Sequence, residues 1–159
     1  MTQYLARKSQ EVMTELATES ETSCESWTTV CEVTLAQVIM FNRRRVGEVS
    51  KMMISDYENA TVGDIHSDIM QHLSELEKRL CNLLTRVQVV GKRGTHVPVL
   101  LTDNFNKALQ VIVSKRAANG VPDFNQFVFA RSGSDKHLRG SDVLRKYAVE
   151  CDVKYPDTT

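Results

Sequence analysis

The feature that most constrains the fold is a change of hydrophobic period at residues 86–102, RVQVVGKRGTHVPVLLT. Apolar residues before it recur at helical spacing, whereas the valines of RVQVV alternate with polar neighbours. A Gly-Lys-Arg-Gly turn at 91–94 follows, and the pattern over 96–101 is extended. This order predicts a β-hairpin. Pro98 cannot donate a hydrogen bond to a partner strand, so its strand is predicted to lie at a sheet edge.

Around the hairpin, apolar residues at helical spacing predict helices. The predicted helices are an amphipathic one over 3–18, a largely buried one over 27–41, its continuation from Val46 to Met53, a leucine-striped one from Ile69 to Leu84, one capped by Asp103, and a last one capped by Ser141 or Asp142. Glu75 and Arg79 are predicted to pair on the outer face of the leucine-striped helix. DYENATVGD (56–64) is predicted to be a loop and FVFA (127–130) a short buried strand.

The predicted fold class is therefore α+β and mainly α, with one small antiparallel sheet. A length of 159 residues fits one domain with a real core. Residues 1–26 are expected to form an N-terminal amphipathic helix and a polar linker. Residues 27–159 are expected to form the main, partial domain.

Charge is balanced overall but unevenly placed. The 20 basic and 20 acidic residues cancel, yet residues 1–42 hold two basic and six acidic residues and residues 43–159 hold eighteen and fourteen. Solvated faces arising by chance would explain this distribution. A local basic surface for an anionic partner would explain it equally well.

Cysteine, histidine and hydropathy patterns predict neither a metal site nor a membrane span. The four cysteines form no CxxC motif, and reduced thiols in an intracellular protein are expected. His66, His72 and Cys81 are a poor zinc set, because residues six apart do not share a helix face. No apolar run reaches the roughly 18 residues that a membrane span needs. No cofactor or membrane partner is expected.

The stretch FNRRRVGEV (41–49) places three arginines directly after the apolar run VTLAQVIM. Adjacent guanidinium groups repel one another and are costly to desolvate. A multiply charged anion would hold them in place. Glu48 follows Arg45 by three residues and would share its helical face.

In the order of its elements the chain resembles the catalytic domain of tyrosine recombinases, the phage integrase family. The resemblance covers roughly residues 27–157 and rests on an Arg-x-x-Glu, a Gly-Lys hairpin turn, RGTHVPVLLTD and FVFAR in sequence. In the residues of these motifs it looks most similar to recombinase-like proteins derived from Crypton-type transposons. The resemblance implies DNA, held by its phosphate backbone, as the partner, and a nuclear location.

By resemblance, Arg45, Glu48 and Lys92 match catalytic positions of the family. Arg45 would hold the non-bridging oxygens of a phosphodiester, Glu48 would orient Arg45, and Lys92 would protonate the departing 5′ oxygen. The expected DNA-backbone contacts are Arg43, Arg44, Arg93, Arg131, Lys136 and Arg139. A solvated basic helix start and a solvated hairpin tip remain the alternatives for these residues.

The family's remaining motifs cannot be placed in this sequence. HLRG (137–140) spaces its histidine and arginine as H-x-R, where the family has a His-or-Lys-x-x-Arg after the last helix matched here. None of the four tyrosines matches the nucleophile, and Tyr147 is better explained as core. When catalytic residues act as a unit, the loss of one of them removes nearly all of the enzyme's turnover. The chain is therefore expected not to cleave DNA: it is a degenerate or truncated DNA-binding protein, or an N-terminal fragment of a longer active recombinase.

A helical protein-interaction module is the competing function. Its partner-facing stripes would be Trp27–Phe41 and Ile69–Leu84. Salt dependence separates the two functions, since DNA binding releases counterions. The coding sequence downstream of Thr159 would show whether the chain is a fragment.

Overall fold

A computed structural model describes residues 1–18, 24–62 and 71–151 of the chain. Its helices are α1 (Thr2–Thr18), α2 (Cys24–Asn42), α3 (Val46–Ser50), α4 (Ile54–Glu58), α6 (Glu75–Leu83), α7 (Asp103–Lys115) and α8 (Gly140–Glu150). Strands β1 (Thr61–Val62), β2 (Thr85–Val90) and β3 (His96–Leu101) form one antiparallel sheet in the order β1-β2-β3. The predicted fold class, mainly helical with a small antiparallel sheet, is confirmed.

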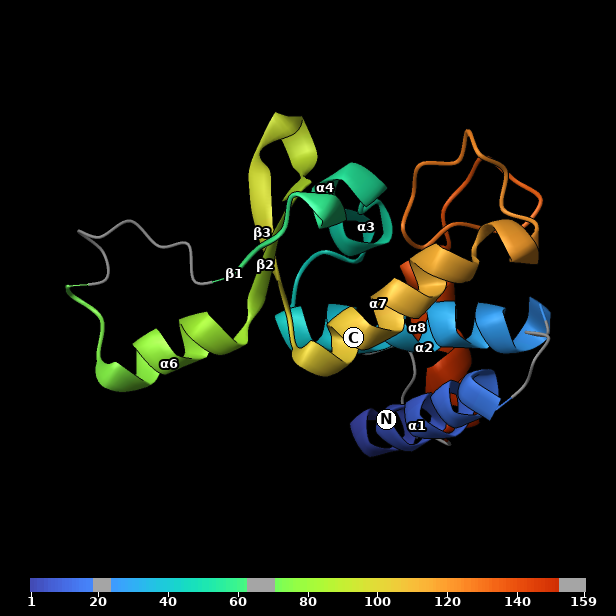
Figure 1. The fold of residues 1–159 in the computed structure, drawn as a ribbon, viewed down its shortest axis with the longest axis horizontal. Helices are drawn as coiled ribbons and strands as arrows, with labels where there is room; N and C mark the ends of the chain where they lie inside the picture. Colours follow the sequence, from blue (N-terminus) through green and yellow to red (C-terminus); the bar gives the residue numbers. More distant parts are fainter. Residues whose placement is uncertain (19–23, 63–70, 152–159) are drawn as a thin grey trace.

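Helix α2 is the centre of the helical body. It contacts α1, α7 and α8, and Figure 1 shows it running through the middle of the right-hand half of the molecule. Its buried side chains lie all around the helix, as the apolar run predicts. Trp27, which is 1% exposed, donates a hydrogen bond from Nε1 to the Ile112 carbonyl at 3.2 Å. This bond gives the buried indole N–H a partner and ties α2 to α7.

Helix α1 packs its predicted apolar side into the same core. Leu5, Val12 and Leu16 are buried there, and α1 contacts α2. At its outer side Lys8 pairs with Glu150 of α8 at 2.8 Å. The division of the chain at residue 26 stays a prediction.

The hairpin forms as its alternation predicts. Val87 and Val89 point into the core, and Lys92–Gly94 make a single 3₁₀ turn between β2 and β3. Strand β3 is an edge of the sheet, so Pro98, which is paired with Gln88, lies at an edge as expected.

Three segments differ from their predictions. The region predicted as a loop at 56–64 contains the end of α4 and strand β1, and its residues 63 and 64 lie outside the described residues. The FVFA segment forms no strand: it makes only isolated bridges, Met53↔Phe127 and Ala130↔His137. The helix predicted from Val46 to Met53 ends at Ser50, because the chain turns there into the bridge at Met53.

The predicted caps of the last two long helices are wrong. Thr102, not Asp103, caps α7: its hydroxyl accepts a hydrogen bond from the Phe105 N–H at 3.4 Å. Helix α8 begins at Gly140 with no side-chain cap from Ser141 or Asp142. Instead the Gly140 N–H donates to Ser50 Oγ at 3.1 Å. A hydroxyl from another helix thus satisfies the first N–H of α8.

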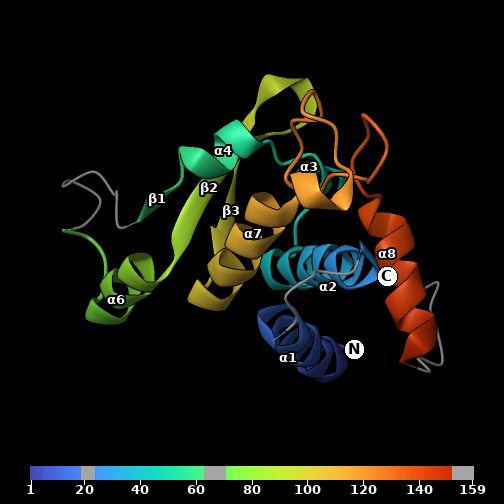
Figure 2. The same cartoon turned by 45° about the vertical axis from the view of Figure 1, so that its right-hand side comes forward.

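Helix α6 stands apart from the helical body. Figures 1 and 2 both show it beyond the sheet, away from α1, α2 and α8. Its side chains Leu76, Leu80 and Leu83 are 68%, 47% and 71% exposed. The ion pair of its outer face joins Glu75 to Lys78 at 2.8 Å rather than to Arg79. Of the helix predicted from Ile69 to Leu84, residues 69 and 70 lie outside the described residues, 71–74 form a turn and a bend, and Glu75–Leu83 is helical. Within the described residues these three leucines stay largely uncovered.

Candidate functional site

The arginine triplet lies in the short connection between α2 and α3. Arg43 adopts a left-handed conformation, with φ 49°, directly after the end of α2. Arg45 occupies the N-cap position of α3 in an extended conformation, with φ −59° and ψ 125°. The resemblance places Arg45 within a helix, whereas the structure places it one residue before one. All three arginine side chains are exposed.

The side chain of Asn42 hydrogen-bonds this connection to β3, the edge strand of the hairpin. Its Nδ2 donates to the Leu100 carbonyl at 2.9 Å, and the Leu100 N–H donates to Asn42 Oδ1 at 2.7 Å. The side chain therefore pairs with β3 much as a further strand residue would. Because Asn42 immediately precedes the triplet, this pair sets where the arginines lie relative to the hairpin.

Arg45 and Glu48 form the pair that their spacing predicts. The distance from Arg45 Nη1 to Glu48 Oε1 is 3.7 Å. The arginine side chain is 74% exposed and the glutamate side chain 12%. A pair with one partner in water adds at most about 1 kcal/mol to stability. Its main physical effect is to bias the direction of the guanidinium group.

Glu48 also contacts the turn of the hairpin. A Cβ added at Gly91 would lie 3.2 Å from Glu48 Oε1 and 2.7 Å from Val97 Cγ2. Only glycine leaves room for this close approach. The Gly91 N–H donates to the Thr95 carbonyl at 2.7 Å and closes the turn. The carboxylate of Glu48 thus lies between Arg45 and the residue that precedes Lys92.

These contacts create a basic depression of about 380 Å³. It is lined by Arg43, Arg44, Arg45, Glu48, Lys92, Thr95 and Val97. Four cationic groups face one carboxylate, and within the described ranges neither Arg43 nor Arg44 has an ion-pair partner. An open depression with this charge excess suits an anion with several oxygens, since guanidinium groups bind such oxygens bidentately.

The other predicted DNA contacts lie outside the basic depression. Arg93 occupies the hairpin turn with φ 63° and is exposed. Arg131 and Lys136 are exposed in the loop before α8, where the Arg131 N–H donates to the Lys136 carbonyl at 2.9 Å. Arg139 precedes α8. Figures 1 and 2 both show this loop and the hairpin turn on the same upper side of the molecule.

The tyrosines within the described part of the chain serve packing. Tyr147 is fully buried, as predicted, and burial raises the pKa of its hydroxyl, with the nearby Glu32 acting in the same direction. Tyr57 is half-buried and its hydroxyl donates to the Asn106 carbonyl at 3.4 Å. Tyr4 donates to Glu150 at 2.8 Å. Tyr155 lies outside the described residues.

The described residues contain neither a cluster of metal ligands nor a membrane-spanning helix. In 1–18, 24–62 and 71–151, no three His, Cys, Asp or Glu side chains gather as metal ligands would. His66 of the predicted poor zinc set lies outside these ranges. Over the same ranges, every helix is too short or too polar to cross a bilayer.

Sequence comparisons and structural comparisons give different results. Neither a protein-family model nor a curated protein matches the sequence. Solved structures do match the fold. The XerH site-specific recombinase bound to palindromic difH substrate, a post-cleavage complex, superimposes with a TM-score of 0.55 at 15% identity over 92% of this chain and 33% of that chain. A pre-cleavage XerH complex with difH gives a TM-score of 0.55 at 15% identity over 94% and 36%.

The structural matches identify the fold as tyrosine-recombinase-like. The chain spans about a third of the length of the recombinase chains that it matches. An identity of 15% establishes architecture and leaves function to the chain's own residues.

Two features of the site were not expected from the sequence. Asn42 gave no signal, because an asparagine at a helix end most often caps its own backbone. Thr95 and Val97 join the lining only because the hairpin folds back toward α3.

Proposed function

We propose that this protein binds the phosphate backbone of DNA, and that the basic depression is its phosphate site. The observation that carries the proposal is the meeting of Arg43, Arg44 and Arg45 with Lys92 around one hollow. Two segments that are 47 residues apart in the chain, counted from Arg45 to Lys92, supply these cations. Like charges gathered without matching acids are costly unless an anion occupies the site. DNA presents such anions in a regular row.

In the proposed complex Arg45 holds two non-bridging oxygens of one phosphate. Glu48 orients the guanidinium group of Arg45 through the 3.7 Å ion pair and restricts its rotation toward solvent. Lys92 approaches the same phosphate from the hairpin turn as a point charge. Arg93, Arg131, Lys136 and Arg139 are exposed and would contact flanking phosphates. The hairpin turn and the loop before α8, which carry Arg93, Arg131 and Lys136, lie on the same side of the molecule (Figure 1). Backbone contacts of this kind position a duplex without specifying its sequence.

Strand cleavage is not part of the proposal for residues 1–159. Tyr147 is buried in the core, and neither Tyr4 nor Tyr57 lines the basic depression. A degenerate protein that has kept binding, and a portion of a longer active recombinase, both fit these residues. A Crypton-type transposon origin and a nuclear location belong to the same proposal; RGTHVPVLLTD and FVFAR support the origin, and DNA as partner supports the location.

A salt titration of duplex binding tests the proposal. By fluorescence anisotropy, the wild-type dissociation constant should lie in the range of about 10⁻⁴ to 10⁻⁶ M that non-specific contacts give at physiological salt. Arg45→Ala should weaken binding and flatten the slope of log affinity against log salt by about one unit. Glu48→Ala should weaken binding less, because Glu48 only orients Arg45.

Arg7→Ala is the matched control for the titration. Arg7 is 70% exposed and pairs with Glu11 at 3.5 Å, but it lies on α1, outside the basic depression. Its removal should leave both affinity and slope unchanged. If Arg45→Ala behaves like Arg7→Ala, the arginine triplet is a solvated surface and the proposed phosphate site is wrong.

The interaction-module alternative has two stripes. Most of Trp27–Phe41 is buried in this chain's own core, so only its end at Met40 and Phe41 is open to a partner. The leucines of α6 remain exposed. A wild-type protein that shows no DNA binding at low salt would leave this alternative as the better one.

A further inference from the structure

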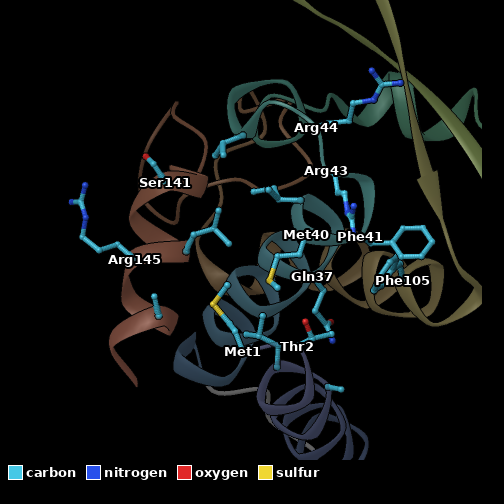
Figure 3. Close-up of a pocket in the computed structure, with 16 residues that line it drawn as sticks. Met1, Thr2, Gln37, Met40, Phe41, Arg43, Arg44, Phe105, Ser141 and Arg145 are labelled. Carbon is cyan, nitrogen blue, oxygen red and sulfur yellow. The ribbon is translucent and has the colours of Figure 1, made fainter. Parts of the chain in front are cut away.

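A large apolar groove lies beside the basic depression. Its volume is about 910 Å³. Ile39, Met40 and Phe41 of α2 line it together with Leu5 of α1 and Leu144 of α8. Figure 3 shows these side chains, with α1 below and α8 to the left of the groove. This site, the apolar groove, plays no part in the proposed phosphate contact.

Among the described residues, every charged side chain that lines the apolar groove is an arginine. Arg43 and Arg44 lie at one side and Arg145 at the other, as Figure 3 shows. Among the residues that the structure describes, the ion-pair partner of Arg145 is Asp142 at the long distance of 4.0 Å, and both side chains are mostly exposed. An apolar floor between cationic rims is complementary to an apolar surface flanked by carboxylates.

The dimensions fit a helix. A helix about 10 Å across with a 5.4 Å pitch fills roughly 850 Å³ over two turns, close to the volume of the groove. The groove runs between α1 and α8 over α2, and a further helix packs on such a floor by ordinary helix-on-helix contact. Apolar residues at i, i+3, i+4 and i+7 of the incoming helix would meet Met40 and Leu144.

We propose that the apolar groove binds an amphipathic α-helix of another protein that carries Asp or Glu on both flanks of its apolar stripe. The charge of the rims selects this occupant over a second copy of the chain. The exposed helix α6 has a leucine stripe, but Glu75 and Glu77 are balanced there by Lys78 and Arg79. A neutral helix gains nothing from three arginines.

The groove and the basic depression share two residues. Arg43 and Arg44 line both. An acidic helix that engages them would reduce their contact with a phosphate, so helix and DNA should compete. This consequence rests on the proposed function, whereas helix binding itself does not.

Three designed peptides of about 14 residues, roughly four helical turns, provide the test. The first has leucines at i, i+3, i+4 and i+7 with flanking glutamates. The second replaces the glutamates by lysines, and the third replaces the leucines by serines. Titration of each into the protein without DNA, followed by methyl NMR, should show at least tenfold tighter binding of the first and a shift of the Met40 methyl.

Arg145→Glu is the decisive variant, because its side chain is 70% exposed and its replacement leaves the core intact. It should weaken binding of the acidic peptide at least tenfold. Arg79→Glu, an equal charge change on α6, should leave peptide binding unchanged.

Equal binding of the acidic and lysine peptides would overturn the proposal, as would peptide shifts confined to α6. Sedimentation velocity tests the alternative occupant. Self-association that disappears in Leu80→Glu and is also displaced by the acidic peptide would show that a second copy's α6 occupies the groove. Absence of DNA binding, with selective peptide binding retained, would refute the proposed function alone.

Discussion

Gly140 lies where α2, α3 and α8 meet, and its replacement by alanine should destabilise the protein. A Cβ at this position would lie 2.6 Å from Ile39 Cδ1, 2.6 Å from Val46 Cγ1 and 2.7 Å from Ser50 Oγ. Ile39 is 4% exposed, and both Ile39 and Val46 line the apolar groove, so the two side chains can shift only toward that groove. Ser50 is also held, because its hydroxyl donates to the Val46 carbonyl at 2.7 Å and accepts from the Gly140 N–H.

The expected cost of Gly140→Ala is that of overpacking the contact between α2, α3 and α8, where three side-chain atoms must shift. One inserted methyl group in a tight core costs about 1–3 kcal/mol. For a chain of this length each kcal/mol lowers the melting temperature by about 2–4 °C, so a fall of roughly 2–12 °C is expected. Calorimetry or urea unfolding measures it. Alanine's backbone preferences add no strain, since the φ of Gly140 is not positive.

Gly47→Ala is the control for this prediction. Gly47 lies within α3, and a Cβ there would meet nothing within 4 Å. Alanine should therefore raise stability, by about 0.5–1 kcal/mol, because glycine loses more backbone entropy in a helix. If Gly140→Ala melts at the wild-type temperature, or both variants shift in the same direction, then α8 does not pack on α2 and α3 as described.

Two further substitutions test the contacts that position α8 and the arginine triplet. Asn42→Ala should lower the free energy of unfolding by about 1–2 kcal/mol in urea titrations, because it removes two hydrogen bonds to the Leu100 backbone; an unchanged midpoint would contradict the pairing. The hydrogen bond from Lys8 lowers the pKa of the Glu150 carboxyl in the folded protein. The pair therefore stabilises the fold fully at pH values above the ordinary pKa of a glutamate. This stabilisation is lost as the pH falls through the lowered pKa of Glu150. Glu150→Gln should therefore flatten the acid side of the stability profile below about pH 4.5, and an identical profile would contradict it.

The sequence predicts elements whose pattern is local. Alternating valines and a Gly-Lys-Arg-Gly turn predicted the hairpin, and helical spacing predicted α2. FVFA was predicted as a strand because Val128, Phe129 and Ala130 are apolar, and they are indeed buried. No neighbouring strand forms a continuous set of backbone hydrogen bonds with this segment, so it stays irregular and makes only isolated bridges. Thr102 could have been found, since threonine is itself a good N-cap.

The site depends on contacts that no local pattern encodes. The spacing of Arg45 and Glu48 predicts their pair, but not that Glu48 also touches the hairpin turn. That contact requires the small size of Gly91 and the hydrogen bonds between the Asn42 side chain and the Leu100 backbone. The exposed leucines of α6 show the same limit, because helical spacing predicts an apolar face and not what covers it.

The most direct test of the shared phosphate site is a double-mutant cycle between Arg45 and Lys92. Arg45→Ala, Lys92→Ala and the double variant are compared with wild type in duplex affinity at fixed salt. Two residues that serve one phosphate share a partner, so their effects should be non-additive by at least about 0.5 kcal/mol. Arg131 lies outside the basic depression, so the effects of Arg131→Ala and Arg45→Ala should add within about 0.5 kcal/mol. Additive losses for Arg45 and Lys92 would mean that the depression does not act as one site.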